Sequence, residues 1–161
     1  IVGKKQPKVG LLNVGKEAGK GNKGYQEAYS LLEDSGINFV GNVEGRDLTM
    51  GSCDVVVSDG FVGNIALKVI EGTASTLVGI LSQEIKSSFI AKIGALLLKN
   101  ALLAMKQKLD FEEYGGAPLL GLNAPVIICH GSSTAKAIKN AIFVGKEMVD
   151  KKLLDSFQDH M

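Results

Sequence analysis

Three short segments of the sequence combine glycine with residues that suit anion binding. They are NVGKEAGKGN (13–22), DGFVGN (59–64) and HGSS (130–133), and each follows an apolar run. In open α/β sheets, ligands bind beyond the carboxyl ends of the strands, where helix N-termini offer amide groups and the positive end of a dipole. The turn and capping preferences of Gly, Asn and Ser explain any one such junction. Three together predict a site for phosphate or another oxyanion.

Lys20 and His130 are the residues of these junctions best suited to chemistry. Lys20 supplies a point charge for a phosphate, although a solvated loop lysine is the ordinary alternative. His130 suits a general acid or a hydrogen-bond donor to a developing oxyanion, although a single histidine at a strand end is more often structural.

Asp59 and Lys68 each have two interpretations that the sequence leaves open. Lys68 lies four residues after Asn64 and three before Glu71. It therefore either pairs with Glu71 on the helix surface or adds positive charge at the anion site. Asp59 is either a turn former or a residue that orients a catalytic group.

Several other site classes are excluded by spacing. A Walker A loop needs four residues between its glycines and a hydroxyl after the lysine, whereas Gly15 and Gly19 enclose three residues and Gly21 follows Lys20. No G-x-G-x-x-G segment follows a strand, which argues against a dinucleotide site. Cys129 and His130 are adjacent in a strand and so point to opposite faces, which argues against a Cys–His catalytic pair. No pair of close His, Cys or acidic residues has metal-ligand spacing, so we expect no metal. We expect no cofactor either.

The composition indicates one domain of an intracellular type. A chain of 161 residues is long enough for one domain with its own core. With 18 basic and 17 acidic residues, and without tryptophan, nucleic acid is an unexpected partner. Two cysteines, Cys53 and Cys129, suit a reducing compartment better than a disulfide scaffold. The segment IVGKKQP lacks the apolar region of a signal peptide.

The hydrophobic pattern alternates between strands and helices. Buried strands are predicted at 8–13, 37–40, 54–58 and 125–129, and helices at 25–34, 46–50, 65–86 and after the GSS segment. The apolar face of the first helix falls on Ala28, Leu31 and Leu32, and that of the last on Ala135, Ile138, Ala141, Ile142, Met148 and Val149. Uniformly apolar strands between amphipathic helices predict an α/β fold with a mostly parallel sheet and helices on both faces.

One segment, 87–110, does not fit this alternation. Between Lys86 and Leu109 there are five lysines and no acidic residue, and Lys92, Lys99 and Lys106 are seven apart, on one stripe of a helix. Such a helix is too apolar to stand alone in water, yet its apolar run is interrupted. A bundle or dimer interface is the first interpretation. A sharper one adds contact with an anionic membrane through Phe89, Ile90 and Ile93, flanked by Lys86 and Lys92.

Long stretches of the sequence resemble the PlsX family of phosphate acyltransferases. The resemblance covers nearly all of residues 8–150 and is carried by VGLLNVGKEAGKGN, GINFVGNVEGRDL, CDVVVSDGFVGNIALKVIEGTA and EEYGGAPLLGLNAPVIICHGSSTAKAIKNAI. The family converts acyl-acyl-carrier-protein and inorganic phosphate to acyl phosphate in bacterial phospholipid synthesis. Its members are longer, and this chain resembles their C-terminal half. Lys16 departs from an expected acidic residue, and Thr134 from the commoner Asn or Asp.

The resemblance implies a fold, an assembly and roles for the site residues. The fold would be isocitrate/isopropylmalate dehydrogenase-like, with residues 1–161 forming one domain and a helical dimerisation arm inserted at about 64–109. Lys20 would hold phosphate, Asn64 would donate to phosphate or oxyanion, and His130 would act as donor or acid. Other residues would support the site: Asp59, Gly60, Gly63, Lys68, Gly131, Ser132 and Ser133. The partners would be acyl carrier protein, inorganic phosphate and a second copy of the chain. The protein would be cytoplasmic and peripherally associated with the membrane.

Two alternatives to this function remain open on the sequence. One is a short-chain phosphotransacetylase or phosphotransbutyrylase that uses coenzyme A. The apolar GGAPLLGLNAP loop and the apolar arm favour a long acyl chain over that alternative. The other is a non-catalytic fragment that dimerises and binds membrane or carrier protein.

Overall fold

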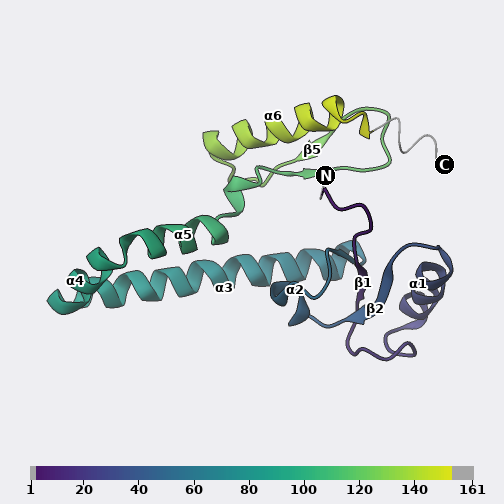
Figure 1. Ribbon diagram of the computed structural model, residues 1–161, viewed down its shortest axis with the longest axis horizontal. Coiled ribbons are helices and arrows are strands. Elements are labelled where there is room, and N and C mark those ends of the chain that lie inside the picture. Colours follow the sequence, from purple (N-terminus) through teal and green to yellow (C-terminus); the bar gives the residue numbers. More distant parts are fainter. Residues whose placement is uncertain (1–2, 154–161) are drawn as a thin grey trace. The chain divides into compact units, whose positions relative to one another are not determined.

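The computed structural model describes residues 3–153, and these form two compact units (Figure 1). The first unit is Ile1–Ile70 and the second is Glu71–Met161, so that the long helix α3 (Gly60–Ser87) belongs to both. Each unit is described by itself.

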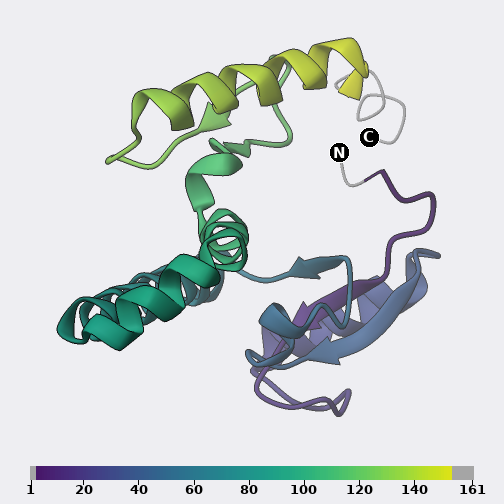
Figure 2. The same ribbon diagram turned by 60° about the vertical axis from the view of Figure 1, so that its left-hand side comes forward.

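The first unit is built on a parallel three-stranded sheet. Its strands are β1 (Val9–Leu12), β2 (Phe39–Val43) and β3 (Val55–Val57), in the order β2-β1-β3 (Figure 2). Residues 9–12 of the central strand are all buried, as the run VGLL predicts for a strand covered on both faces. The parallel sheet predicted from the sequence is confirmed for these three strands.

Two helices of the first unit begin close to the predicted positions. Helix α1 (Lys23–Asp34) starts at Asn22, whose Oδ1 accepts from the Tyr25 amide at 3.2 Å, and α2 (Asp47–Met50) is the predicted short helix. The Tyr29 ring of α1 lies edge-on against Phe39 of β2, with ring centroids 5.1 Å apart. Leu31 was predicted to face the core, but it is 73% exposed. The packed face of α1 instead comprises Tyr25, Ala28, Tyr29 and Leu32, all half-buried, so the prediction holds for Ala28 and Leu32.

The apolar segment after β3 forms three helices rather than two. Helix α3 is followed by α4 (Phe89–Leu97), which begins with the Ser88 side chain as cap, and α5 (Lys99–Leu109). In Figures 1 and 2, α4 and α5 lie alongside the second half of α3. The single helix predicted over 87–110 is thus broken at Leu98, where neither glycine nor proline signals the break. As a result Lys92 lies on a different helix from Lys99 and Lys106, and the predicted lysine stripe is not continuous.

Helix α3 is, within the described residues, the one helix long and apolar enough to cross a membrane by length and composition. This is weak evidence, because the apolar helices of water-soluble proteins pass the same test.

The rest of the second unit is a short ribbon packed on a helix. It comprises the single-turn helix η1 (Phe111–Glu113), strands β4 (Ala117–Pro118) and β5 (Ile127–Ile128), and α6 (Ala135–Asp150). The strand predicted over 125–129 is confirmed only for the two residues of β5, and its predicted place in the parallel sheet is wrong, since β5 pairs antiparallel with β4. Periodicity identified an apolar strand, but it carries no information about the partner with which that strand pairs.

The face of α6 that packs inward is rotated from the predicted one. Ala137, Ala141 and Met148 are buried, as predicted for the last two. The other predicted residues include Ile138, Ile142 and Val149, which are 43%, 68% and 59% exposed. Because small residues allow close approach, the helix presents Ala137 and Ala141 to the turn that precedes β4.

That turn contacts the α6 backbone directly through Gly115. The residue has a φ of +75°, and a Cβ added to it would lie 2.3 Å from the Ala141 nitrogen and 2.8 Å from the Ala137 oxygen. A side chain at position 115 would therefore push the turn away from α6.

We expect Gly115→Ala to lower the free energy of unfolding by at least about 1–2 kcal/mol, the cost of the left-handed backbone alone. The contact with α6 adds to this cost. Gly79→Ala is the control: it lies within α3 with no atom near its added Cβ, so it should be neutral or stabilising by about 0.5–1 kcal/mol. Urea denaturation measures both. Equal stability of the two variants would contradict the role of Gly115.

Candidate functional site

Two buried asparagines lie where β1 and β2 end. Asn13 directly follows β1 and is 9% exposed, and Asn42 lies near the end of β2 and is 5% exposed. The Asn13 amide nitrogen donates to Asn42 Oδ1 at 3.2 Å, so that the two side chains form a buried pair. Buried polar groups need hydrogen-bond partners. The remaining partners of both asparagines lie in the glycine-rich loop 13–22.

The asparagine pair and Gln26 hold the main-chain carbonyls of this loop. Asn13 donates to the Lys20 oxygen at 3.0 Å, and Asn42 donates to the Glu17 oxygen at 2.7 Å. Gln26, on α1, donates to the oxygens of Gly19 and Gly21 at 2.9 and 3.2 Å. The loop therefore has a defined path, and Lys20 projects from it. Lys20 is exposed, and its ammonium forms no ion pair with any residue in the range 3–153.

The loop also requires glycine at position 21, and it is tied to α2. Gly21 has a φ of +88°, and a Cβ added there would lie 2.7 Å from Asn13 Oδ1. At the other end of the loop, the Lys16 ammonium lies 3.3 Å from the Asp47 carboxylate, which is nearly buried. The Glu44 amide, which donates to Asp47, and the Lys16 cation hold the pKa of Asp47 below its ordinary value. The lysine at the position where an acidic residue was expected thus has an anionic partner.

At the DGFVGN junction, Asp59 caps the start of α3. Its Oδ1 accepts from the amides of Phe61 and Val62 at 2.8 and 2.9 Å, and its Oδ2 accepts from the Tyr25 hydroxyl of α1. The hydrogen bond from the Tyr25 hydroxyl is the main cause that lowers the pKa of Asp59, and the bond from the Val62 amide is the next. The Tyr25–Asp59 hydrogen bond also raises the pKa of Tyr25.

This cap answers one question that the sequence left open and limits the expected anion site. Asp59 is a capping residue that also anchors Tyr25. An oxyanion at the start of α3 would have to displace the carboxylate from the Phe61 and Val62 amides, since these are the groups that such a site would use. Asn64 is exposed, and its side chain has no hydrogen-bond partner within residues 3–153. Lys68 and Glu71 both have interaction partners in the structure.

In the second unit, the HGSS turn fixes the ring of His130. The Ser132 amide donates to His130 Nδ1 at 3.2 Å, and the Ser132 hydroxyl lies 2.6 Å from the same nitrogen. The Ser133 hydroxyl donates to the His130 carbonyl at 2.7 Å. Because Nδ1 accepts from an amide, the neutral ring carries its proton on Nε2.

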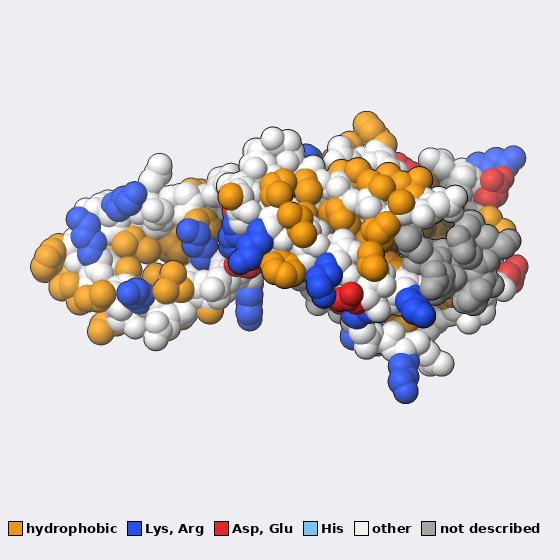
Figure 3. All heavy atoms as spheres, turned by 90° about the horizontal axis from the view of Figure 1, so that it is seen from above, with side chains coloured by type: hydrophobic (Ala, Val, Ile, Leu, Met, Phe, Trp, Pro, Cys, Tyr) orange, Lys and Arg blue, Asp and Glu red, His pale blue; other side chains and the backbone are white. Residues whose placement is uncertain are grey.

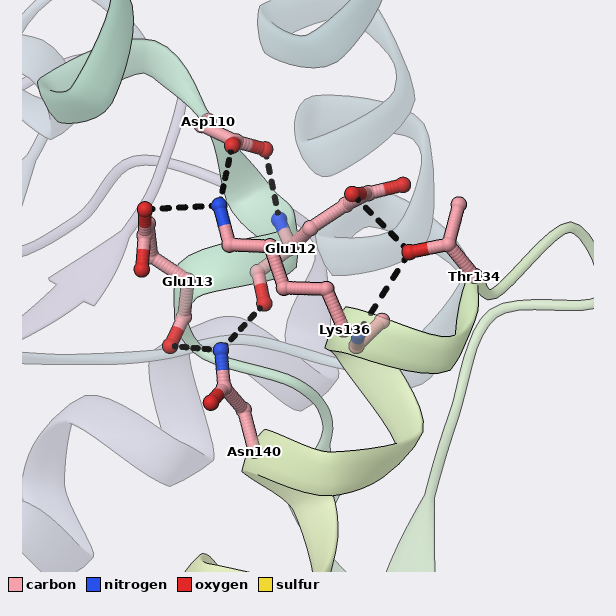
Figure 4. Close-up of polar contacts among 7 residues, drawn as sticks. Asp110, Glu112, Glu113, Thr134, Lys136 and Asn140 are labelled. Atoms are coloured by element: carbon pink, nitrogen blue, oxygen red, sulfur yellow. Dashed lines mark hydrogen bonds and ion pairs between the residues drawn. The ribbon is translucent and has the colours of Figure 1, made fainter.

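The start of α6, directly after this turn, is held to η1 by a polar cluster (Figure 4). Lys136 contacts the carboxylates of Asp110 and Glu113 at 2.8 and 2.7 Å, and Asn140 donates to the carbonyls of Glu112 and Glu113. The hydrogen bonds to these carboxylates raise the pKa of Lys136, and the bond to Asp110 has the larger effect. Lys136 in turn lowers the pKa of Asp110. Thr134, the second departure noted in the sequence, caps α6 and donates to Glu112 at 3.0 Å. The cluster thus holds the helix that begins beside His130.

The predicted site residues fall into two groups. Lys20, Asp59, Gly60, Gly63, Asn64 and Lys68 belong to the first unit, and His130, Gly131, Ser132 and Ser133 belong to the second. That the two groups form one site stays a prediction. Within the described residues there is no cluster of His, Cys, Asp or Glu that could hold a metal ion.

Sequence reasoning missed the residues that position these groups. Asn13, Asn42, Tyr25 and Gln26 were not among the candidates. The available signal was that an asparagine ends each of two neighbouring apolar strands, where an amide side chain must find partners once it is buried.

Residues 1–155 of the chain match the sequence model of a protein family described as "Fatty acid synthesis protein". The chain belongs to this family. This match, together with the relatives described next, confirms the resemblance that the sequence motifs indicated.

Curated relatives carry that name. The chain is 56% identical over 152 residues to the phosphate acyltransferase of Pelotomaculum thermopropionicum, a match that covers 94% of this chain and 44% of that protein. It is 51% identical over 161 residues to that of Brevibacillus brevis and 52% to that of Bacillus anthracis, covering 100% of this chain and 48% and 49% of those proteins. The chain therefore spans about half the length of the curated relatives it matches.

The Tyr25–Asp59 contact makes a prediction about titration. We expect Tyr25→Phe to raise the pKa of Asp59 toward its ordinary value, because the hydroxyl is the main cause of its depression. A depressed carboxylate pKa stabilises the fold above the ordinary pKa, and this contribution is lost as the pH falls through the folded pKa. The stability difference between variant and wild type should therefore shrink in acid.

Carboxyl-carbon NMR titration measures the Asp59 pKa directly. Tyr29→Phe is the matched control, since Tyr29 lies one turn along the same helix and packs on Phe39 instead. An Asp59 titration that is unchanged in Tyr25→Phe, or shifted equally in Tyr29→Phe, would show that the hydroxyl contact is unimportant.

Proposed function

We propose that this chain contributes the phosphate-holding loop and part of the acyl site of an acyltransferase. The enzyme would convert acyl-acyl-carrier-protein and inorganic phosphate to acyl phosphate for phospholipid synthesis. The observation that carries the proposal is the identity of 51–56% to relatives named phosphate acyltransferase, over nearly the whole of this chain. The glycine-rich loop supports it, since its Lys20 ammonium forms no ion pair with any residue that the structure describes.

In the proposed reaction the protein itself forms no covalent bond with the substrates. A phosphate oxygen attacks the thioester carbonyl carbon, the carbonyl becomes a tetrahedral oxyanion, and the C–S bond breaks to release the carrier thiolate, which takes up a proton. Phosphate is already a nucleophile, so catalysis consists of holding it against the carbonyl and stabilising the oxyanion. No covalent acyl-enzyme is required.

Three residues would act on the reacting groups. Lys20 holds phosphate, because its cation stands on a loop fixed by Asn13, Asn42 and Gln26. Asn64 donates to phosphate or to the oxyanion. His130 donates from Nε2, the nitrogen that carries the proton when Nδ1 accepts from Ser132. Supporting positions are Gly60, Gly63, Lys68, Gly131, Ser132 and Ser133, while Asp59 supports the site by capping α3 and holding Tyr25.

We expect Lys20→Ala and Asn64→Ala each to lower kcat/KM for acyl phosphate formation by about 100-fold or more, the usual effect of removing one preorganised donor. Lys23→Ala is the control, since Lys23 is an exposed lysine paired with Glu27 on α1 and should keep near-normal activity. The assay uses the intact protein, with palmitoyl carrier protein and acetyl-CoA as separate donors. Near-normal turnover in folded Lys20→Ala and Asn64→Ala would refute the site, and preference for acetyl-CoA would favour a short-chain phosphotransacetylase.

The helical segment α3–α5 would serve as a dimerisation arm with a membrane-contacting tip. Phe89, Ile90 and Ile93 are 77%, 80% and 47% exposed, and the lysines Lys86 and Lys92 are exposed beside them. Figure 3 shows hydrophobic side chains and lysines together at the end of the helical segment where α4 lies. Exposed apolar residues flanked by lysines are typical of peripheral contact with anionic lipid. A second copy of the chain would cover the remaining leucines, and the protein would stay cytoplasmic when unbound.

We expect Phe89→Asp plus Ile93→Asp to abolish co-sedimentation with anionic vesicles, while wild-type binding weakens with added salt. Each lysine near the bilayer contributes about 1 kcal/mol. Ile142→Asp plus Val149→Asp introduces the same charge on the exposed side of α6 and should leave binding intact. Equal binding by a still-dimeric Phe89→Asp plus Ile93→Asp variant would mean that the arm serves oligomerisation alone.

A further inference from the structure

A cavity of about 400 Å³ opens in the first unit, beyond the carboxyl end of β1. Its apolar wall comes from three places: Leu12 and Val14 at the end of β1, Leu48 of α2, and Val62, Ile65 and Ala66 on one side of α3. The size falls in the ordinary range of small-molecule sites, about 300–1,000 Å³. Gly21 and Asn22, the two residues after Lys20, also line it.

The polar residues of this cavity are already engaged with the protein itself. Asn13 donates to Lys20 and Asn42 and accepts from the Val14 amide at 2.8 Å. Asn22 Oδ1 caps α1, and the Tyr25 hydroxyl donates to Asp59. A polar ligand group placed here would lose its water and meet a mainly aliphatic wall with few free partners, which is costly.

The apolar wall, in contrast, is exposed to water. Val14 is 81% exposed and Ile65 is 47% exposed, so the rim of the cavity presents hydrophobic surface. Covering such surface with an apolar ligand is favourable in proportion to the area removed from water. Wall and rim therefore select for a hydrocarbon.

We propose that this cavity binds the acyl chain of the thioester substrate, which deepens the proposed function and rests on it. The carbonyl end of the chain then lies toward the loop that carries Lys20, since that loop forms one wall. The chain fits better than the carrier's pantetheine arm, because the wall is mainly aliphatic and offers few partners to the amides of pantetheine. Phosphate is held outside the cavity by the loop, and the acyl chain is held within it.

The test fills the cavity from α3. Ala66→Phe and Val62→Phe each place a ring in the cavity, whereas Leu67→Phe adds a ring at the next position of the same helix, outside the lining and 60% exposed. The measured quantity is kcat/KM for palmitoyl carrier protein divided by that for octanoyl carrier protein, in the intact protein. A methylene group in an apolar pocket is worth about tenfold or more in kcat/KM. We therefore expect the ratio to fall at least about tenfold in folded Ala66→Phe and Val62→Phe, and to stay unchanged in Leu67→Phe.

A binding measurement separates failure of this inference from failure of the proposed function. If the wild-type protein forms acyl phosphate but the cavity-filling variants keep the wild-type chain-length ratio, the inference is overturned and the function stands. If the wild type forms no acyl phosphate from any donor, the function fails and the affinity for the fluorescent fatty acid cis-parinaric acid decides. Weaker binding by Ala66→Phe or Val62→Phe, but not by Leu67→Phe, supports the cavity. Equal binding by all, or none by the wild type, overturns it.

Discussion

The arrangement of the first unit depends on the buried contact between Asn13 and Asn42. Two amides at the ends of neighbouring strands would each cost about 1–3 kcal/mol if left without partners. They are satisfied by each other and by the carbonyls of Glu17 and Lys20, so their burial fixes the loop. Gly21 is then required because a side chain there would collide with Asn13. Lys20, Lys16 and one wall of the apolar cavity all take their positions from this contact.

The same unit separates charged from apolar functions over a short distance. Asp59 occupies the Phe61 and Val62 amides at the start of α3, so in the proposed site the positive charge for an anion would come from lysine side chains rather than from the helix terminus. Tyr25 holds that carboxylate and closes one side of the cavity, whose other residues are mainly aliphatic. The proposed acyl transfer to phosphate would use this division, because one substrate is a small dianion and the other carries a hydrocarbon chain.

The sequence predicted well those elements that local patterns determine. Strand β1 and the short helix α2 follow from apolar runs, and α1, predicted over 25–34, begins two residues earlier, at Lys23. The antiparallel pairing of β5 with β4 and the exposure of Leu31 were missed, because both depend on what lies opposite in space. In the candidate site, Lys20 was proposed for its charge, and its role stays a prediction. Asn42 was not among the candidates, because the sequence alone does not show that its amide is buried against Asn13.

The central claim is that the buried asparagine pair positions Lys20 to hold phosphate. It is tested most directly by the KM for inorganic phosphate in Asn42→Leu, which removes the donor to Glu17 and the acceptor for Asn13 while keeping the volume of the side chain. The account predicts a KM for phosphate at least about tenfold above wild type, equivalent to about 1.4 kcal/mol, in a protein that still unfolds cooperatively. A folded Asn42→Leu protein with the wild-type KM for phosphate would contradict it.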